Sequence, residues 1–579
     1  MGLVSPGSTE NSYMNKTNQF SGNLLLLKSL LVLTLVITFY SSGAQSLKCQ
    51  WARASGTIGN GEFGSVTTDQ QGNVYISGIF YDSVLIFGSD TLLNSAVGTA
   101  DIYVVKYNFY GGIVWAKRLG GEENDDINGI ATDNAGNLYL TGYYESPYFA
   151  AGQDTLRSPG NTFVLKYDAS GNEIWARTSV GSSMSTSIAI DIKGNVCIAG
   201  DFWNTFTAFG NDTLRDVNYR GYNIFVVKYN AAGSLLWLKG GNQTLDGDAS
   251  LYDINTDASG NFYVSGCLST QLVFGTDTLI PYIFSEYSLF LIKLDSSGNS
   301  QWAKCIGSFG YPPYQSSTID AAGNVFLIGD FTYFPINIGT DTIQAKQYDI
   351  FIIKYNSSGN LVWAKTAGNG DTAEAMVYGS CTDPQGNIYV SGYFSKPLLI
   401  IGGDTLYNPD SAQVISLLKL DNNGNAQWLK GAGQHGYNIG SSVASDVLGN
   451  IYMTGSFSDT AIYFDSVRFI PGSTNVSGVY LARYGYANES VPGSETNEQT
   501  LKIYPNPVSE GNAITATFKQ GQYDHIIIFN SLGQFAAKAE IGLNDTKVEI
   551  GLQSLPDGMY YLKATGKDNN VALPVIIRH

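Results

Sequence analysis

The chain has 579 residues, a formal net charge of −17 and 14% charged residues, with 66 glycines and 38 tyrosines. A chain of this length is expected to hold more than one domain. The low charge content and many glycines favour short strands and turns over long surface helices. The negative charge repels phosphate backbones and anionic lipid, which argues against nucleic-acid and membrane-surface binding. The five cysteines show no metal-ligand spacing, so no cofactor is expected.

Residues 1–44 are predicted to be a secretory signal peptide. The apolar run at 29–40 is preceded by Lys28 and is too short to span a bilayer as a stable anchor. Small residues follow it, which predicts cleavage between Ala44 and Gln45. No later segment is apolar enough to cross a membrane, so we expect no membrane span after the signal is removed.

Residues 45–486 contain one unit that is repeated seven times. Each copy has a turn of the form Asp-x-x-Gly-Asn, and the copies lie 58 to 66 residues apart. A run such as "VYISGIF" follows each turn, then a run such as "DIFIIKYN", a second glycine-containing turn, and a run such as "LVWAKTAG". The seven turns begin at Asp69, Asp133, Asp191, Asp257, Asp320, Asp383 and Asp446.

This unit predicts four strands, which we name a, b, c and d. Strand a ends at the first aspartate, b follows Gly-Asn, c carries a lysine and d carries a tryptophan. The runs are rich in β-branched and aromatic residues and are bounded by Gly, Asn and Asp, which is typical of hairpins. Strands b, c and d are apolar at nearly every position, so we expect both of their faces to be covered. Four-stranded sheets packed face to face around an axis form a β-propeller.

The first tryptophan run, at Trp51, has no strands a, b and c before it. The last unit has a, b and c but no d, and its strand c carries Arg483. A ring whose last sheet is completed by the first strand has no open edges. The sequence therefore predicts an all-β fold with a seven-bladed propeller closed by its N-terminal strand.

After Tyr486 the composition changes. Residues 487–499 are polar and acidic without periodicity, which indicates a linker. Residues 500–579 hold short strand-like runs with turn residues between them, which favours a small β-sandwich.

Both regions resemble known families. The repeated units resemble the seven-bladed propeller repeats of secreted bacterial proteins. The tail resembles the type A C-terminal sorting domain of the Bacteroidota type IX secretion system. That resemblance implies the type IX machinery as a partner, and a protein that passes through the periplasm and is then secreted or held at the outer cell surface. The residues that carry it are Tyr504, Pro505, Asn506, Pro507, Gly533, Gly558 and Tyr560.

Candidate catalytic chemistry is sparse. His435 is the only histidine in the propeller region, which argues against a histidine-based triad or a zinc site there. The Asp-x-x-Gly-Asn segments are interpreted as turns, because a turn itself needs their Asp and Asn side chains. Calcium binding is the alternative, although a calcium loop has more alternating oxygen ligands. The threonine of a repeated "DTL" or "DTI" element is interpreted as part of a turn, with O-glycosylation as the alternative.

The b–c and d–a connections of a four-stranded blade emerge on one face of the disc, which we call the loop face. The a–b and c–d turns emerge on the other, the turn face. The turns are nearly identical in every unit, whereas the loops differ, and variable loops on a rigid scaffold usually carry function. The predicted ligand contacts are Glu122, Asp125, Asp126, Asp246, Asp248, Tyr311, Tyr314 and His435.

These features favour a secreted or surface-bound, non-enzymatic binding or adhesion module over an enzyme, with a surface glycan or a protein as its ligand. One alternative is an extracellular enzyme that acts on polysaccharide or peptide through carboxylates of the propeller funnel. The other is a structural component of a surface layer.

Overall fold

The computed structural model describes most of the chain after residue 46. The described ranges are 47–58, 61–157, 161–216, 221–243, 247–283, 286–309, 315–331, 336–338, 341–343, 349–367, 375–408, 410, 412–433, 435–458, 462–469, 478–486, 501–504, 513–518, 520–521, 523–530, 535–542, 544–553, 555–556, 558–565 and 570–577. The predicted signal peptide, its cleavage site at Ala44 and Gln45, and the predicted linker 487–499 lie outside them. In these ranges the regular elements are β-strands, and no helix there is long and apolar enough to cross a membrane.

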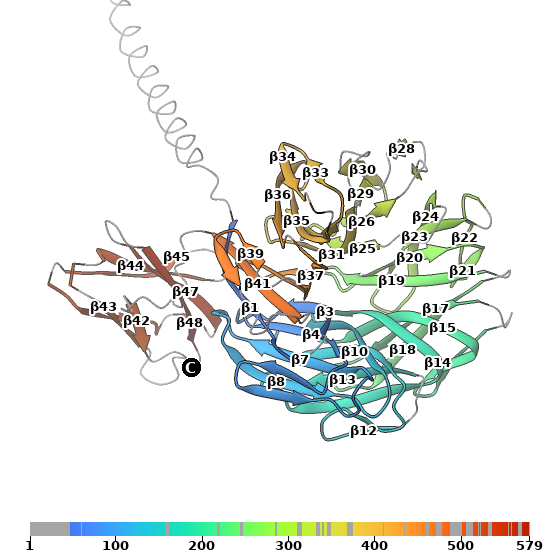
Figure 1. Ribbon diagram of the computed structural model, residues 1–579, viewed down its shortest axis with the longest axis horizontal. Coiled ribbons are helices and arrows are strands. Elements are labelled where there is room, and N and C mark those ends of the chain that lie inside the picture. The colour runs from blue at the N-terminus through green and yellow to red at the C-terminus, as the bar shows by residue number, and fades with distance from the viewer. Residues whose placement is uncertain are drawn as a thin grey trace, which may run out of the picture. The chain divides into compact units, whose positions relative to one another are not determined.

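The repeated units form antiparallel sheets in which strands a, b, c and d lie in that order. Figure 1 shows them following one another along the chain from β3 to β41. The first three units are built from β3 (Gly61–Thr68), β4 (Val74–Phe80), β7 (Asp101–Tyr107) and β8 (Ile113–Leu119); β9 (Asp125–Thr132), β10 (Leu138–Tyr144), β13 (Asn161–Tyr167) and β14 (Glu173–Ile190); and β14 again with β15 (Val196–Phe209), β17 (Asn223–Tyr229) and β18 (Leu235–Gln243).

The later units continue the same strand order. Their strands are β19 (Ala249–Thr256), β20 (Phe262–Leu268), β23 (Tyr287–Leu294) and β24 (Ser300–Phe309); β25 (Gln315–Ile319), β26 (Val325–Phe331), β29 (Asp349–Tyr355) and β30 (Leu361–Ala367); β31 (Ala375–Thr382), β32 (Ile388–Phe394), β35 (Val414–Leu420) and β36 (Ala426–Ala432); and β37 (Ile439–Ser445), β38 (Ile451–Phe457) and β41 (Gly478–Tyr486). Neighbouring strands a contact each other from β3 through β37, and β37 also contacts β3. This arrangement of sheets is that of a β-propeller.

The first described strand, β1 (Leu47–Ala54), completes the sheet that begins with β37. The order in that sheet is β1-β41-β38-β37, and Figure 1 shows β1 in blue beside β41 in orange. The Ser55 amide donates to the Val479 carbonyl oxygen at 2.9 Å. Trp51 is therefore in the sheet that contains Arg483, where closure by the N-terminal strand requires it to be.

Small strands extend the b–c connections. Six of the seven pairs end in the "DTL"-type element, whereas β40 follows Asp465-Ser466, and the threonines of that element are exposed. The pairs are β5 (Val84–Phe87) with β6 (Asp90–Leu93), to which β2 (Gly56–Ile58) adds; β11 (Phe149–Ala150) with β12 (Thr155–Leu156); the end of β15 with β16 (Asp212–Arg215); β21 (Leu272–Phe274) with β22 (Asp277–Leu279); β27 (Ile336–Ile338) with β28 (Asp341–Ile343); β33 (Leu398–Ile401) with β34 (Asp404–Tyr407); and β39 (Ile462–Phe464) with β40 (Val467–Phe469).

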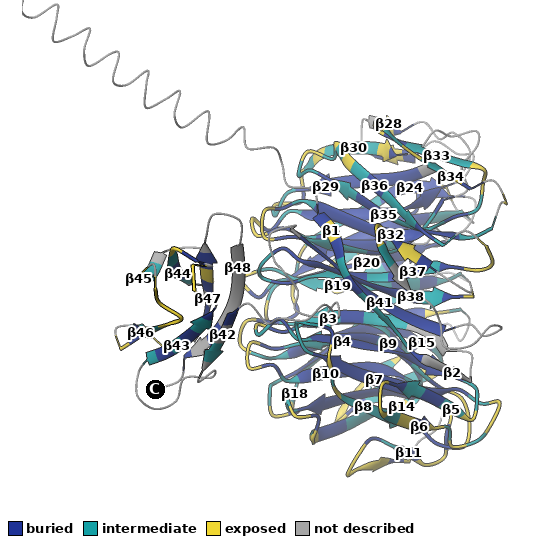
Figure 2. Cartoon of the chain, turned by 60° about the vertical axis from the view of Figure 1, so that its left-hand side comes forward, coloured by how far each residue is buried: buried dark blue, intermediate teal, exposed yellow. Residues whose placement is uncertain are grey.

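How deeply a strand is buried depends on its position within the unit (Figure 2). Strands b and c are covered on both faces as predicted, and all seven residues of both β4 and β7 are buried. The same expectation for strand d is wrong. Most residues of β8 are only half-buried and Val114 is exposed, because β8 is the outermost strand of its sheet.

One predicted loop is a strand. The segment 179–185 is one of the d–a connections, which the sequence predicts to be loops, but β14 runs through it without a break. It pairs with an extension of β15, with Ser179 opposite Phe209 and Ser182 opposite Trp203. The extension supplies backbone partners for the whole segment, so strand pairing replaces the loop at this unit.

A bulge in most of the inner strands explains a glycine in strand b. In β9 the bulge places the Asp126 carbonyl oxygen 2.0 Å from where a Cβ on Gly142 would be. The same clash would arise between Gly266 and the Ser250 carbonyl, at 2.1 Å. Only glycine permits this approach, so the repeated "G" of runs such as "LYLTGYY" is required by the bulge.

The C-terminal region forms two antiparallel sheets over an apolar core that includes Ile526, Leu562 and Val575. The strands are β42 (Leu501–Tyr504), β43 (Ala513–Phe518) and β46 (Lys547–Gly551) in one sheet, and β45 (Phe535–Glu540), β44 (His525–Asn530), β47 (Gly558–Thr565) and β48 (Asn570–Ile577) in the other. Two sheets around one core are the sandwich that the sequence predicts.

Candidate functional site: the loop face and the axial cavity

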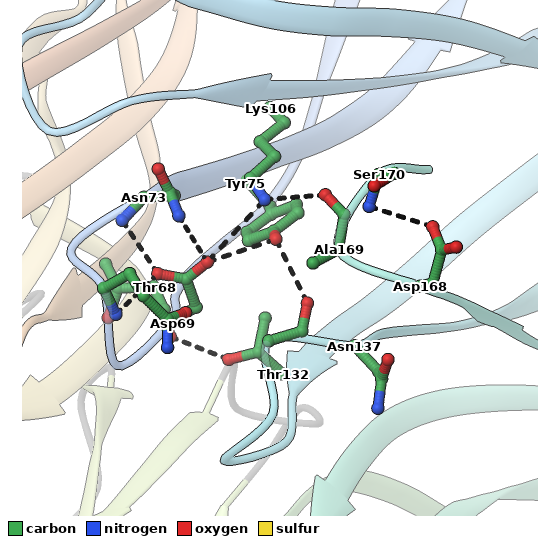
Figure 3. Close-up of polar contacts among 12 residues, drawn as sticks. Thr68, Asp69, Asn73, Tyr75, Lys106, Thr132, Asn137, Asp168, Ala169 and Ser170 are labelled. Atoms are coloured by element: carbon green, nitrogen blue, oxygen red, sulfur yellow. Dashed lines mark hydrogen bonds and ion pairs between the residues drawn. The ribbon is translucent and has the colours of Figure 1, made fainter. Parts of the chain in front are cut away.

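The a–b turns are held by their own aspartates. Asp69 Oδ1 accepts the Gln71 and Asn73 amides, each at 2.9 Å, and Oδ2 accepts Asn73 Nδ2 at 2.7 Å and the Tyr75 hydroxyl at 3.2 Å (Figure 3). Gly72 closes the turn with φ of 75°. The same two amide bonds recur at every one of the seven turns. These oxygens are therefore used by the turn, as the turn interpretation expects.

The strand c lysine joins neighbouring units. Lys106 Nζ donates to the Ala169 carbonyl oxygen of the next c–d turn at 2.8 Å and lies 3.9 Å from Asp69 Oδ2 (Figure 3). Trp115 Nε1 donates to the same carbonyl at 3.5 Å. The lysine is buried and 4.9 Å from the Tyr75 ring centre, so its charge is compensated inside the protein. Its partners give it a structural role at the unit boundary.

The N-terminal strand makes the same inter-unit contact. Trp51 Nε1 donates to the Phe109 carbonyl at 3.3 Å, and Arg53 Nε donates to the Gly111 carbonyl at 2.9 Å. Gly111 has φ of 76°, and a Cβ there would be 3.0 Å from the Trp51 ring. Trp51 therefore packs on the c–d turn after β7, as Trp115 packs on the turn that contains Gly171.

The inner strands surround a cavity of about 420 Å³ on the propeller axis. It is lined by all seven strands a, and a second cavity of about 350 Å³ shares Ile188, Ile254 and Asn255 with it. The second cavity extends to Gln70 and Asn134 of the a–b turns, so the first lies toward the loop face. The polar residues that line the first cavity are Ser65, Asn128, Thr186, Ser187, Asp253, Asn255, Gln315, Ser316, Ser317, Ser380, Ser441 and Ser442, with Tyr252 and Tyr378 beside them.

Among the described lining residues, the acidic one is Asp253. Its Oδ1 accepts the Ser187 hydroxyl at 2.8 Å and the Ile254 amide at 2.9 Å. Its Oδ2 accepts the Ser317 amide at 2.9 Å and the Ser317 hydroxyl at 3.1 Å. Burial raises the pKa of Asp253, although these bonds oppose the rise. The carboxyl group thus connects the inner strands of three consecutive units.

Two more buried carboxyl groups lie at the loop-face end of strand b. Burial raises the pKa of Asp201 to about 8 and that of Asp330 to about 7. Asp201 Oδ1 accepts the Leu251 amide of the next unit at 2.8 Å. Asp330 accepts the Val377 amide of the next unit in the same way. These side chains link neighbouring units just above the cavity.

The acidic loop at 122–126 has some side chains exposed to solvent and others buried in the protein. Glu122 is exposed, whereas Asp125 is fully buried and accepts the Gly121 amide at 2.7 Å and the Ser146 hydroxyl at 2.7 Å. Burial raises the pKa of Asp125 to about 6. Asp126 is half-buried and accepts the Ile127 amide. Asp125 therefore joins the d–a loop to the following b–c connection.

The other predicted contacts are spread over several units. Asp248 is half-buried, and its Oδ1 accepts the Tyr222 amide at 3.3 Å. His435 Nδ1 lies 2.8 Å from Asp410 Oδ2, with both side chains exposed. Asp246, Tyr311 and Tyr314 lie outside the described residues. Within the described residues, no group of three or more His, Cys, Asp or Glu side chains is arranged to hold a metal ion.

Aromatic side chains are exposed on the loop-face connections. Tyr407 is 78% exposed and Tyr437 72%. The exposed tyrosines of these connections are Tyr148, Tyr222, Tyr282, Tyr407, Tyr437 and Tyr463. Tyr222 also packs edge-on against Trp203, at 5.7 Å between ring centres. Exposed aromatic rings supply contact area at a low cost in conformational entropy.

The sequence reasoning missed the axial cavity and the exposed tyrosines. A signal for the cavity is present, because several strands a are rich in small residues just before the Asp-x-x-Gly-Asn turn, as in "STSIAI" and "GSSVAS". Small residues on the strands nearest the axis leave space between them. A signal for the tyrosines is their position in the loop-face connections.

The sorting-motif residues are only partly described. Tyr504 ends β42 and Gly558 begins β47. Tyr560 is buried, and its hydroxyl donates to the Pro556 carbonyl at 3.0 Å. Pro505, Asn506, Pro507 and Gly533 lie outside the described residues.

Two segments match known protein families. Residues 114–143 match a beta-propeller repeat, and residues 502–578 match the secretion system C-terminal sorting domain. The matches confirm that the chain carries a propeller repeat and a C-terminal sorting domain, as the sequence motifs indicated. The protein carries a type IX sorting domain, and it is therefore exported by the type IX secretion system to the cell surface or the extracellular space.

Curated relatives add little about activity. An uncharacterized WD repeat-containing protein of Acanthamoeba polyphaga mimivirus is 24% identical over 615 residues, which cover 88% of this chain and 43% of that protein. The regulatory protein FlaEY of Caulobacter vibrioides is 27% identical over 292 residues, which cover 48% of this chain and 30% of that protein. The chain spans less than half the length of either relative.

Among solved structures, an apocarotenoid oxygenase of Synechocystis has a TM-score of 0.35 at 10% identity, covering 77% of this chain and 97% of that one. A gluconolactonase of Xanthomonas campestris has a TM-score of 0.29 at 10% identity, covering 62% and 86%. A protein of unknown function from Dyadobacter fermentans has a TM-score of 0.31 at 11% identity, covering 61% and 96%. At these TM-scores the likenesses carry no argument about function.

Proposed function

We propose that the propeller is a non-enzymatic binding module that meets its ligand on the loop face. The observation that carries this proposal is the set of exposed tyrosines on the described loop-face connections, among which Tyr407 and Tyr437 are the most exposed. Tyrosine is enriched at recognition surfaces because it combines a large apolar face with a hydrogen-bonding end. Export to the cell surface or beyond places this face where it meets external glycans and proteins.

The hydrogen bonds that the buried carboxyl groups accept from the scaffold support a binding role over a catalytic one. Asp125, Asp201 and Asp253 each accept hydrogen bonds from backbone amides that hold two or more segments together. A general acid or base needs a proton-transferring atom within reach of the substrate. Carboxyl groups that are committed to the scaffold serve the fold, whereas the exposed aromatic rings remain on the surface for a partner.

The test is a binding screen of the mature, full-length protein against surface glycans and extracellular proteins. We expect saturable binding without turnover. The Tyr407→Ala and Tyr437→Ala double variant should lose binding by at least tenfold, whereas Ile192→Ala should not, because Ile192 is an exposed apolar side chain on an a–b turn. Turnover of a bound polysaccharide or peptide would establish the enzyme alternative, and ordered self-assembly without a ligand would favour a surface-layer component.

A further inference from the structure

One tryptophan lies outside the repeat. The chain has eight tryptophans, and seven of them are in the d runs of the repeated units. The eighth, Trp203, is in β15 at the loop-face end of strand b of the third unit. The repeat does not require a tryptophan there, because the corresponding residue of other units is Tyr81, Glu145 or Ser269. Trp203 is half-buried, so part of its side chain is accessible to solvent.

An irregular backbone segment follows Trp203 on the loop face. The pairing of β14 with β15 shifts between Gly181 and Ser182, so residues 204–206 have no opposite residue on β14. Asn204 has a φ of 67°, which is uncommon for residues other than glycine, and its Nδ2 donates to Ser182 Oγ at 2.9 Å. Unusual backbone conformations cluster at binding and active sites, so this segment directs attention to the tryptophan beside it.

Two tyrosines form an aromatic cluster with Trp203. Tyr222, just before β17 of the same unit, packs edge-on against it, with 5.7 Å between ring centres, and is 45% exposed. Tyr143, at the end of β10 in the preceding unit, is half-buried, and its ring centre is 6.5 Å from that of Trp203. The cluster therefore crosses the boundary between the second and third units, and a partner in solution can reach all three side chains.

Acidic side chains lie beside this cluster. Glu145 is exposed and accepts a hydrogen bond from the Tyr143 hydroxyl. Asp126 is opposite Tyr143 in the register of β9 and β10, and Asp248 Oδ1 accepts the Tyr222 amide at 3.3 Å. The whole chain has a formal net charge of −17. These charges repel an anionic partner and attract a cationic one.

The tryptophans of the repeat show which group covers such a ring elsewhere in the protein. In five units the Lys or Arg two positions later lies over the ring, 5.3 to 5.9 Å from its centre; the pairs are Trp51–Arg53, Trp115–Lys117, Trp175–Arg177, Trp363–Lys365 and Trp428–Lys430. Trp203 is followed by Asn204 and Thr205 instead. Among the described residues, no Lys or Arg lies over the ring of Trp203, Tyr143 or Tyr222. The cluster thus lacks the cation that the repeat supplies to its own tryptophans.

We propose that the cluster of Tyr143, Trp203 and Tyr222 receives a lysine or arginine side chain from a basic segment of a partner protein. This inference rests on the proposed binding function and names the chemistry of the partner. The cation lies against the Trp203 ring, and Glu145 and Asp248 compensate its charge. A basic segment is favoured over a glycan, because carboxylates beside exposed rings attract a charge that a neutral sugar lacks.

The experiment measures binding of the mature full-length protein to oligoarginine by isothermal titration calorimetry. Oligocitrulline of the same length is the uncharged probe of similar shape, and it should bind at least about tenfold more weakly. Trp203→Ala should weaken oligoarginine binding at least about tenfold, and Trp203→Phe should weaken it less, because a phenylalanine ring attracts a cation less strongly. Tyr222→Ala and Glu145→Gln should each weaken it by a smaller factor.

The matched controls are Leu236→Ala and Asp212→Asn. Leu236 is an exposed apolar side chain on β18, the strand d of the same unit, and Asp212 is an exposed carboxylate on β16 of that unit. Both variants should bind oligoarginine as the wild type does, and melting curves establish that each variant is folded. If the folded Trp203→Ala and Tyr222→Ala variants also keep wild-type affinity, or if oligocitrulline binds as tightly as oligoarginine, the inference is wrong.

The outcomes also separate this inference from the proposed function. Absence of oligoarginine binding would overturn the cationic site, and glycan binding that is lost in Trp203→Ala would then assign the cluster to a sugar. Binding of another ligand that depends on Tyr407 and Tyr437 but not on Trp203 would leave the loop-face module in place. Absence of binding in the wider screen of glycans and proteins would overturn the module itself.

Discussion

The turn face and the loop face of the propeller use the same residue type in different ways. On the turn face, Asp69 and its six counterparts all hold an a–b turn through the same amide bonds. On the loop face, Asp125 joins two loops within a unit, and Asp201 joins strand b to the next strand a. A contact that recurs in every unit shows how units are built and joined, whereas a contact made in only one or two units distinguishes those units from the rest.

Among the changes to repeated contacts, deleting residues 45–56 should lower the free energy of unfolding the most. The deletion removes β1, and with it the nearly buried Trp51 and the bonds from Trp51 and Arg53 to the c–d turn after β7. Loss of a buried tryptophan alone costs about 3–5 kcal/mol, and β41 becomes an open edge. We expect a fall in the free energy of unfolding of at least about 5 kcal/mol, or aggregation, in denaturant titrations.

The control for this deletion is Val362→Ala. Val362 precedes the tryptophan of another strand d but is exposed. It should change stability by less than about 0.5 kcal/mol. Unchanged melting of the deletion variant would contradict closure of the ring by the N-terminal strand and, with it, the count of seven blades.

Asp191→Ala should have the next largest effect. Lys228 Nζ lies 2.9 Å from Asp191 Oδ2, and both side chains are nearly inaccessible to solvent. Removing the carboxylate leaves a buried ammonium without its partner, which costs about 3–5 kcal/mol. Asp168→Ala is the matched control, because Asp168 holds a c–d turn in the same way but through hydrogen bonds that are exposed to solvent. It should cost about 1 kcal/mol in the same urea titration.

The effect of Asp191→Ala should depend on pH. Burial by itself would raise the pKa of Asp191, but hydrogen bonds from Asn195 and Lys228 outweigh it and hold the pKa below its usual value. Stability from such a group is present above its unfolded pKa of about 3.9 and is lost as the pH falls through the lower folded pKa. The difference between wild type and variant should therefore shrink below about pH 4. A difference that is independent of pH would contradict the ionic nature of the pair.

Features that recur in every unit could be predicted from the sequence better than features that occur in only one unit. The pairing of the lysine with the tryptophan run was predictable, and Lys106 is opposite Trp115 in the register of β7 and β8. The repeat fixes which strands are adjacent within a unit. It does not specify the partner in the next unit, such as the Ala169 carbonyl, because that contact depends on how the sheets are rotated against one another.

Unique features of the site were predicted less well. Asp125 was expected to face a ligand, and its loop position was correct, but a backbone that folds over the side chain buries it. Sequence alone does not show whether a carboxylate in a loop will find enough amide donors to become part of the scaffold. The strand at 179–185 shows the same limit, because an extension of β15 competes successfully with the loop conformation.

Asp201→Asn should remove a loss of stability that the wild type shows as the pH rises. Burial raises the pKa of Asp201 to about 8, so between about pH 3.9 and pH 8 the folded state keeps a proton that the unfolded state has lost. Wild-type stability should therefore fall as the pH rises through this window and level off above it. The asparagine variant stays neutral, so it should be more stable than the wild type at pH 9. The measurement is the melting temperature between pH 5 and pH 9. Asp212→Asn, at an exposed position on β16, is the control that should match the wild type.

The smallest effect is expected from Ser146→Ala. The Ser146 hydroxyl donates to Asp125 Oδ2 at 2.7 Å in a site that is closed to solvent. Its loss removes one bond to a carboxylate that still accepts the Gly121 and Glu145 amides, so we expect a cost of about 1 kcal/mol. The removed bond favours the ionised form, so the pKa of Asp125, which burial raises to about 6, should rise further in the variant.

Carbon-detected NMR titration of the Asp125 carboxyl group measures that rise, and thermal melting measures the cost. Ser170→Ala is the matched control, because Ser170 is exposed on a c–d turn and contributes its backbone amide, which the substitution retains. It should leave both quantities unchanged. If Ser146→Ala left the pKa of Asp125 where it is, the hydroxyl would not be the donor that joins these two loops. The unique contact on the loop face would then rest on backbone amides alone, as the repeated contacts on the turn face largely do.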